Sequence, residues 1–433
     1  MKCINCGTDN NLKDRTANQG RCKQCNHPFA FESTSMGNVK ITDSMFAKIL
    51  ADISANNTLY FTPKQFLYFL DNRIRKKGFK RSSFIPMYLF FNIWVTGFVG
   101  GIMSAFLPKS FLVANLLYQA GTIFYLFKNT KASKLTNASR KASAKSLQFI
   151  GVLILVVGIS SSLFIFNSFI LFSIVVILGM LSIFLGTRQL GKVGNLPQEF
   201  LVTQSYLDIC LKRWQQINGT LDRVLPVPQE KITPVAINPD VTAYSFDRLV
   251  VCDSATIAQL LIANNFHFEN NCAILSINGY PQSIFNTTME MLRRNPELQI
   301  FALHDCSFTG VSLVHLLRTS ESWFLNSDVK IIDVGLFPRQ ILANKRGMFV
   351  QNAASLGKKS QELPIEVRQS LSAEELQWLD AGNFVELESF TPQMLIKVLR
   401  SGISGSSNLE SDDSSLILIG DSGNDIYMVE SFG

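Results

Sequence analysis

Charged side chains are missing from long stretches of this 433-residue chain, and that absence is its most informative feature. Residues 146–187 run for 42 positions without one Asp, Glu, Lys or Arg. A helix needs roughly 20 apolar residues to cross a bilayer, so this run is long enough for two spans, with a tight turn expected at Asn167-Ser168. Two buried helices of a large soluble core are the alternative. The length of the run and its complete lack of charge argue against that alternative.

Two further uncharged runs, 82–108 and 110–127, are separated only by Lys109. The three runs together predict four transmembrane helices arranged as two hairpins. We expect them over residues 84–107, 110–127, 147–166 and 169–187 within a transmembrane region 82–187.

Acidic residues are scarce in the first part of the chain. Residues 1–187 hold 21 Lys and Arg but only 6 Asp and Glu, whereas residues 188–433 hold 19 and 27. The basic residues gather before the first predicted span, between the second and third, and after the fourth, so the positive-inside rule places both termini in the cytoplasm. The N-terminus is polar, which predicts no signal peptide. We therefore expect a multi-pass protein of the inner (plasma) membrane.

The same charge distribution bears on partners. Basic connectors suit the anionic lipids of a cytoplasmic leaflet, so membrane lipids are the first expected partner. Residues 188–433 are mildly acidic, which disfavours non-specific nucleic-acid binding and leaves it open only for a local basic patch.

Only eight cysteines occur, and four of them form two CxxC pairs separated by fifteen residues: Cys3, Cys6, Cys22 and Cys25. Two such knuckles place four thiolates around one ion, which resembles a zinc ribbon and predicts a structural zinc ion in a domain of residues 1–32. A redox pair is the alternative, but it would not need two matched knuckles. Gly7 and Asn26 directly follow the knuckles and suit tight turns.

The rest of the chain divides by composition. Residues 38–81 predict a helical juxtamembrane segment, with Thr62 as the cap of a helix and Pro63 at its first position. Residues 188–245 predict a linker, helical at first and then proline-rich. An α/β domain is expected over residues 246–403, and residues 404–433 predict a flexible linker with a short C-terminal hairpin. The expected fold class is thus multi-domain: a small zinc ribbon, a four-helix transmembrane region and a mostly parallel sheet domain.

Within residues 246–403, short apolar runs alternate with helical segments. Strands are expected at 249–252, 272–277, 299–304 and 329–334, with helices at 254–264, 283–294 and 310–318 between them. Strands separated by helices predict βαβ units and a parallel sheet, with functional residues at the carboxyl ends of the strands.

Three sequence segments follow these predicted strands in order: Gly279-Tyr280-Pro281, then His304-Asp305-Cys306-Ser307-Phe308-Thr309-Gly310, then Asp333-Val334-Gly335-Leu336. Their order and spacing resemble the Toprim domain of the topoisomerase VI A-subunit and its meiotic double-strand-break relatives, over roughly residues 246–403. The resemblance implies a Toprim-like sheet and a Mg²⁺ site for phosphoryl transfer. It also implies ligand-binding positions at Gly279, Tyr280, Ser307 and Gly310.

The departures from that pattern bear on activity. Asp305 matches the first aspartate of the family's metal motif, but Ser307 replaces the second, and the expected glutamate falls on Cys252 or on Asp253. A serine hydroxyl is a poor substitute for a carboxylate around a hard dication. The segment before the sheet is also too short and proline-rich for the family's tyrosine-bearing winged helix. We therefore expect no DNA cleavage through a tyrosyl intermediate, while a residual Mg²⁺ site made by Asp253 and Asp305 remains open.

Two other sequence features bear on catalysis. Ile419-Gly420-Asp421-Ser422-Gly423-Asn424-Asp425 resembles the last acidic motif of haloacid-dehalogenase-like phosphatases, whose aspartates bind Mg²⁺. A turn between strands 416–419 and 426–429 is the favoured interpretation. His304, next to Asp305, is a candidate general acid or base, although a strand-end histidine is more often structural.

These patterns predict a membrane-tethered recognition or scaffold protein without catalytic activity, which binds a protein, a nucleotide or nucleic-acid ends. A protein partner is expected at its zinc ribbon or its Toprim-like domain. The first alternative is a Mg²⁺-dependent nuclease or phosphatase that uses Asp253 and Asp305. The second is a structural membrane organiser. No Ser/His/Asp arrangement and no phosphate-binding glycine loop is visible.

Overall fold

The computed structural model describes residues 1–32, 39–75, 81–106, 109–133, 135, 137–192, 197–228, 246–293, 295, 297–343, 348–353 and 362–405. The chain forms two compact units. One contains residues 75–199 and 344–350, and the other contains residues 1–74, 200–343 and 351–433. We call them the membrane unit and the soluble-face unit. The favoured C-terminal hairpin, Asp421 and Asp425 lie outside the described residues.

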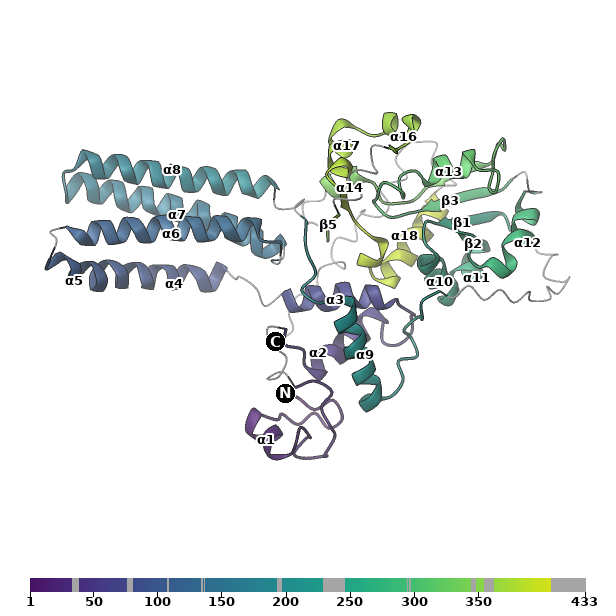
Figure 1. Ribbon diagram of the computed structural model, residues 1–433, viewed down its shortest axis with the longest axis horizontal. Coiled ribbons are helices and arrows are strands. Elements are labelled where there is room, and N and C mark those ends of the chain that lie inside the picture. The colour runs from purple at the N-terminus through teal and green to yellow at the C-terminus, as the bar shows by residue number, and fades with distance from the viewer. Residues whose placement is uncertain are drawn as a thin grey trace. The chain divides into compact units, whose positions relative to one another are not determined.

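The membrane unit contains four helices that are long and apolar enough to cross a bilayer: Phe84–Ser104, Ser110–Lys131, Ser139–Phe164 and Phe169–Lys192. Figure 1 shows them running side by side. The first is built from α4 (Arg81–Trp94), a π-helical turn (Val95–Val99) and α5 (Gly100–Ser104), and the others are α6 (Ser110–Lys131), α7 (Asn137–Phe164) and α8 (Phe169–Lys192). The four predicted spans are therefore confirmed as helices of spanning length. Asn167 adopts a positive φ of 47° at the predicted turn between α7 and α8.

Helices α7 and α8 pack with their backbones close together. A Cβ atom at Gly186 would lie 2.9 Å from the Ala144 carbonyl oxygen, and one at Gly151 would lie 2.8 Å from the Gly179 carbonyl oxygen. Lipid supplies no hydrophobic drive for helix association, so such small residues strengthen the pair through close van der Waals packing.

A helical core begins the soluble-face unit. It unites α2 (Asp43–Ile53), α3 (Pro63–Arg75) and α9 (Gln204–Asn218). Phe46 is fully buried at its centre, with ring centroids 4.9 Å from Phe31, 4.8 Å from Phe66 and 4.8 Å from Trp214. Burying one such ring stabilises the fold by about 1.5–3 kcal/mol. Residues 204–218, expected to belong to a linker, thus form part of this core, because Leu207, Leu211 and Trp214 recur on one helix face.

The predicted capping of α3 is present. The Gln65 N–H donates to the Thr62 Oγ1 at 3.0 Å, while the Gln65 side chain accepts the Thr62 N–H at 3.0 Å. Each side chain thereby accepts a hydrogen bond from a backbone N–H group that would otherwise have no partner at the start of the helix.

The sheet contains four parallel strands in the order β2-β1-β3-β4. They are β1 (Arg248–Cys252), β2 (Cys272–Ser276), β3 (Gln299–Leu303) and β4 (Lys330–Asp333), each within about one residue of its predicted bounds. Helices α10 (Ala255–Ala263), α11 (Phe266–Asn270), α12 (Gln282–Leu292) and α13 (Leu313–Thr319) connect them. The mostly parallel sheet expected from the sequence is confirmed.

The strand order dictates where helices lie. The chain moves one way from β1 to β2 and the other way from β2 to β3 and β4, so right-handed crossovers put α10 on one face and α12 and α13 on the other. Side chains of α12 and α13 accordingly share one core with β1, β2 and β3. The reversal of direction makes the carboxyl ends of β1 and β3 a topological switch point, where ligands bind in open α/β sheets.

The remaining elements follow β4 in the chain (Figure 1). They are α14 (Pro338–Ala343), β5 (Gln351–Asn352), α16 (Ile365–Ser370), α17 (Ala373–Asp380), β6 (Asn383–Phe384), a 3₁₀ turn (Leu387–Ser389) and α18 (Pro392–Gly405). Strands β5 and β6 pair antiparallel, apart from the main sheet.

Candidate functional site

The four N-terminal cysteines converge at one point. Their sulfur atoms all lie within 4.8 Å of one another, with 3.6 Å between Cys3 and Cys25 and 3.5 Å between Cys6 and Cys22. A metal bound tetrahedrally at about 2.3 Å from each sulfur separates the sulfurs by about 3.8 Å. The cluster is therefore shaped to hold a metal ion such as zinc.

The two knuckles repeat the same backbone geometry. Cys3 N–H donates to the Thr8 carbonyl and Cys22 N–H to the His27 carbonyl, both at 2.9 Å. Gly7 and Asn26 follow with φ values of 73° and 57°, so the predicted turns are present. Backbone N–H groups of Cys25 and Gln24 lower the pKa of the Cys22 thiol to about 6, which favours the thiolate form that binds metals.

Buried polar contacts hold the ribbon in place. Asn10 is fully buried and donates to the Cys22 sulfur at 3.5 Å, while its side-chain oxygen accepts the Lys23 N–H at 2.9 Å. The buried Asp43 carboxylate at the start of α2 accepts the N–H groups of Ala30 and Phe31, both at 2.9 Å. These bonds tie the end of the ribbon to the helical core.

A second cluster lies at the switch point of the sheet. The Asp253 carboxylate, directly after β1, accepts the Asp305 N–H at 2.6 Å, and the Asp305 carboxylate accepts the Leu387 N–H at 2.6 Å. The structure thus brings together the two aspartates that the sequence singled out. Both carboxylates have one oxygen bonded to backbone.

Two glutamates complete this cluster, which we call the acidic edge: Asp253, Asp305, Glu386 and Glu388. The Lys64 ammonium, from α3, lies 2.6 Å from Glu386 and 3.7 Å from Glu388. The Thr62 hydroxyl donates to Glu388 at 2.8 Å and the Tyr68 hydroxyl donates to Glu386 at 2.6 Å. The first turns of α3 therefore place one cation and two hydroxyls against the carboxylates.

Burial and mutual repulsion change the acidity of the edge. Desolvation raises the pKa of Asp305 well above its ordinary range, and the neighbouring charge of Asp253 adds to the rise. Desolvation likewise raises the pKa of Asp253 and of Glu388. Burial alone would lower the pKa of Lys64, but Glu386 and Glu388 outweigh it and raise that pKa. Lys64 is thus held as a cation by its acidic neighbours.

His304 is fully buried between two acceptors. Its Nδ1 lies 2.8 Å from the Asp305 carbonyl oxygen and its Nε2 lies 3.0 Å from an Asp333 carboxylate oxygen. A backbone carbonyl and an ionised carboxylate only accept hydrogen bonds, so the ring donates to both when both of its nitrogens carry a proton, as an imidazolium. Burial by itself lowers the pKa of His304, but the Asp333 carboxylate outweighs it and raises that pKa to about 9. A Cβ at Gly335 would overlap the ring, so only glycine fits there.

The four predicted ligand-binding residues lie in two different turns, one after β2 and one after β3. Gly279, with a φ of 81°, and Tyr280 form the turn after β2, where the Tyr280 N–H donates to the Ser276 hydroxyl at 3.1 Å. The Ser307 hydroxyl accepts the Gly310 N–H at 3.0 Å and so closes the turn after β3. Each of these residues shapes a loop at the carboxyl end of the sheet, as the order of the motifs predicted.

Sequence reasoning missed Lys64, Tyr68, Glu386 and Glu388 as members of this region, and it named Asp333 in a strand-end motif without pairing it with His304. Glu386 and Glu388 lie in an ordinary polar turn, and Lys64 lies more than 300 residues before them in the chain, so no local spacing links them. Within the described ranges, the four cysteines are the one group of three or more Cys, His, Asp or Glu donors close enough together for a metal ion. Comparisons of the chain with protein-family models, curated proteins and solved structures give no match.

Proposed function

We propose that this protein is a multi-pass membrane protein that presents a recognition or scaffold unit, built from a structural zinc ribbon and a Toprim-like sheet domain, to the cytoplasm. Basic connectors on one side of the four helices support this orientation. Four thiolates in tetrahedral proximity support zinc, which prefers sulfur ligands. Partners of the unit would be a protein and, at the basic connectors, membrane lipids.

One observation carries the non-catalytic part of the proposal: the protein's own groups occupy the acidic edge. Lys64 supplies the cation between Glu386 and Glu388, and backbone N–H groups bind Asp253 and Asp305. A Mg²⁺ site needs several oxygen ligands that face open space and water. An ammonium group and two backbone donors in that place favour a structural role for the carboxylates.

The alternative is a Mg²⁺-dependent phosphoryl-transfer enzyme. It is favoured by the position of Asp253 and Asp305 at the switch point, and by the Asp253 Oδ1 atom, which is buried and has no hydrogen-bond partner in the described part of the chain. A hard dication would bind such an oxygen. The two proposals differ in whether the edge takes up Mg²⁺ while Lys64 is present.

Calorimetric titration of Mg²⁺ into the full chain separates them, because Mg²⁺ does not compete for the cysteine thiolates. Under our proposal the wild-type protein gives no saturable binding, while Lys64→Met, which removes the internal cation, gains it. Lys48→Met on α2 serves as the matched control and should behave as the wild type. Saturable binding by the wild type that is lost in Asp305→Asn would contradict the proposal and support the enzyme.

A second measurement tests the recognition role. Partners cross-linked to the full chain in membranes would be compared between the wild type, a variant of the ribbon (Cys3→Ser with Cys22→Ser) and a variant of the sheet domain (Asp305→Asn). Loss of one defined partner in either variant assigns the recognition surface. An unchanged cross-link pattern in both variants would contradict a recognition role for these two domains.

A further inference from the structure

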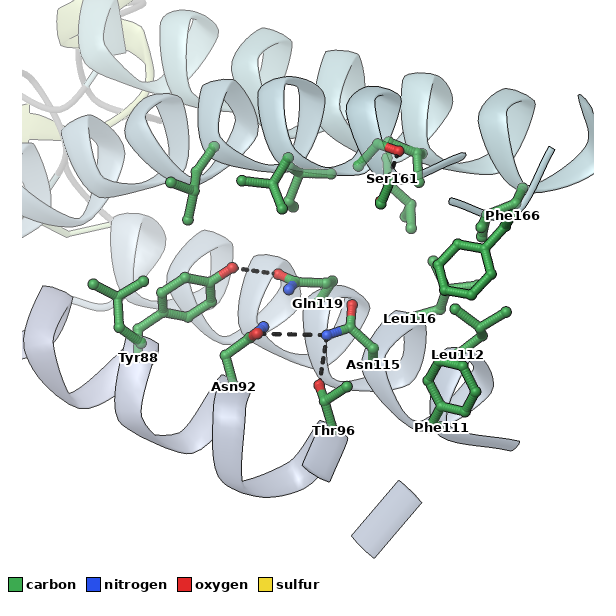
Figure 2. A pocket seen from close by; sticks show the side chains of 18 residues that line it. Tyr88, Asn92, Thr96, Phe111, Leu112, Asn115, Leu116, Gln119, Ser161 and Phe166 are labelled. Atoms are coloured by element: carbon green, nitrogen blue, oxygen red, sulfur yellow. Dashed lines mark hydrogen bonds between the residues drawn. The ribbon is translucent and has the colours of Figure 1, made fainter. Parts of the chain in front are cut away.

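Uncharged polar side chains gather between the first span and α6, along the uncharged runs 82–108 and 110–127. Tyr88, Asn92 and Thr96 recur every four residues along the first span, and Asn115 and Gln119 do so along α6. This spacing puts each set on one helix face, and Figure 2 shows the two sets pointing toward each other. Polar residues are rare at membrane depth and mark functional sites there.

These side chains line a cavity of about 360 Å³ between α4, α6, α7 and α8. That volume is within the range of small-molecule sites. Apart from the polar cluster, its walls are mostly aliphatic and aromatic, and no lining residue is charged. Leu89 and Val157 belong to the lining yet are 42% and 59% exposed, so the cavity reaches the lipid-facing surface.

The cavity lies deep in the bilayer. At 1.5 Å per residue, Asn92 and Thr96 lie about 12 and 18 Å along the span Phe84–Ser104, near the middle of a hydrocarbon core about 30 Å thick. A charged headgroup at this depth would cost several kcal/mol. An occupant must therefore be neutral.

Hydrogen bonds within the cluster leave groups open. Tyr88 donates to the Gln119 carbonyl oxygen at 2.5 Å, and the Asn115 amide nitrogen donates to Thr96 at 2.7 Å and, at 3.5 Å, to Asn92. Among the described residues, these bonds leave the side-chain nitrogens of Gln119 and Asn92 without an acceptor and the side-chain oxygen of Asn115 without a donor. An open amide group in hydrocarbon costs free energy, so the cluster favours a ligand that both accepts and donates hydrogen bonds.

The backbone adds an independent feature at the same place. Thr96 lies in the π-helical turn Val95–Val99, the one interruption of regular helix within the described spans. Such turns occur often at functional sites, because they redirect side chains that a regular helix would space evenly.

We propose that this cavity binds a neutral acylglycerol, whose ester carbonyl accepts from Asn92 and Gln119 and whose free hydroxyl donates to Asn115. The acyl chains would leave past Leu89 and Val157 into the surrounding lipid. A phospholipid fits less well, because its charged headgroup cannot enter. A quinone fits less well, because its carbonyls only accept.

Native mass spectrometry of the full chain in detergent, titrated with dioleoylglycerol, tests this assignment. The double variant Asn115→Leu/Gln119→Leu keeps the side-chain volumes similar and removes both an open donor and the open acceptor. Each lost hydrogen bond is worth about 1 kcal/mol, so the Kd should rise at least about tenfold. Gln148→Leu, an amide-to-leucine change on α7 outside the cavity, should leave the Kd unchanged.

Two probes with matched features decide the occupant. Dioleoylphosphatidylcholine carries the same acyl chains with a charged headgroup, and decylubiquinone offers acceptors without a donor. Tighter binding of dioleoylglycerol than of either probe is expected. Equal binding of the phospholipid, tighter binding of the quinone, or an unchanged Kd in the double variant would overturn the proposal. Should the double variant unfold, Asn92→Leu supplies the same comparison with one donor removed.

Discussion

The soluble-face unit contains two clusters of potential metal ligands, the four cysteines and the acidic edge. They differ in the source of the positive charge that balances them. The cysteine cluster gathers four sulfurs, and the other side chains bonded to them in the described residues, Thr8 and Asn10, are uncharged. At the acidic edge, by contrast, Lys64 lies between Glu386 and Glu388. Next to the edge, the His304 ring bonds the Asp305 backbone carbonyl and the Asp333 carboxylate.

The two clusters therefore differ in whether they need a bound metal ion to balance their negative charge. Burial raises the pKa of the Cys3 thiol to about 11, whereas the pKa of Cys22 falls to about 6. Four thiolates this close together would repel one another, so we expect the cluster to need a bound cation to hold all four in that form. At the acidic edge, Lys64 and two backbone N–H groups already bind the carboxylates, so part of their charge is compensated within the protein. A cluster of potential metal ligands therefore indicates a metal site only where no lysine, arginine or protonated histidine of the protein already occupies the position of the metal ion.

Removing the cysteine ligands should give the largest effect. Structural zinc contributes about 10–16 kcal/mol in zinc-finger peptides, so Cys3→Ser with Cys22→Ser should abolish metal binding and unfold residues 1–32. Metal content measured by mass spectrometry would fall, and hydrogen exchange of the ribbon would rise. Cys210→Ala, in the helical core, should retain the metal. If residues 1–32 stay protected from hydrogen exchange without bound metal, the cysteine cluster does not need a cation and the proposed difference between the two clusters is wrong.

The buried pair of His304 and Asp333, next to the acidic edge, should make the free energy of unfolding depend on pH. The pKa of His304 is raised from 6.5 to about 9 in the fold. The stabilisation is therefore complete below about pH 6.5 and is lost as pH rises through 9, by about 3 kcal/mol in all.

Thermal unfolding of the full chain between pH 6 and 10 measures this loss. Asp253, Asp305 and Glu388 also titrate, so the difference between the wild type and Asp333→Asn isolates the contribution of His304. A wild-type curve as flat as that of Asp333→Asn above pH 6.5 would show that His304 is neutral in the fold.

An intermediate effect is expected from Asn10, which supports the cysteine cluster without binding the metal. Asn10→Ala removes its bond to the Cys22 sulfur and leaves the Lys23 N–H unpaired. Supporting groups of this kind change metal affinity about 10–100-fold. Competition with a zinc chelator measures the change, with Asn5→Ala as an exposed control in the same ribbon. Equal affinities in the two variants would contradict a supporting role.

The smallest effect should come from Thr62, which links α3 to the acidic edge. Thr62→Val removes the helix cap and the bond to Glu388, at a cost of about 1–2 kcal/mol. Thr42→Val on α2 removes a cap alone, since Thr42 caps Met45 at 3.3 Å. The excess cost of Thr62→Val in chemical denaturation measures the bond to Glu388. No excess would mean that the hydroxyl contributes only as a cap.

Features whose residues lie close together in the chain were predictable from the sequence. Uncharged runs located the four long helices, because hydrocarbon excludes charge along every residue of a span. Two CxxC pairs located the metal cluster, because a knuckle brings its own cysteines together within four residues. Periodic apolar runs located the strands to about one residue, and Thr62-Pro63 located the start of α3.

Tertiary structure alone decided which distant residues meet. It placed α9 in the helical core rather than in a linker, and it made His304 a buried imidazolium by pairing it with Asp333. It also brought Lys64 to Glu386 and the open amides of the spans to one cavity. The physical reason is that these contacts depend on how helices pack and strands are ordered. Local spacing in the sequence does not show that Lys64 contacts Glu386, more than 300 residues away. It also does not show that the polar face of the first span packs against that of α6.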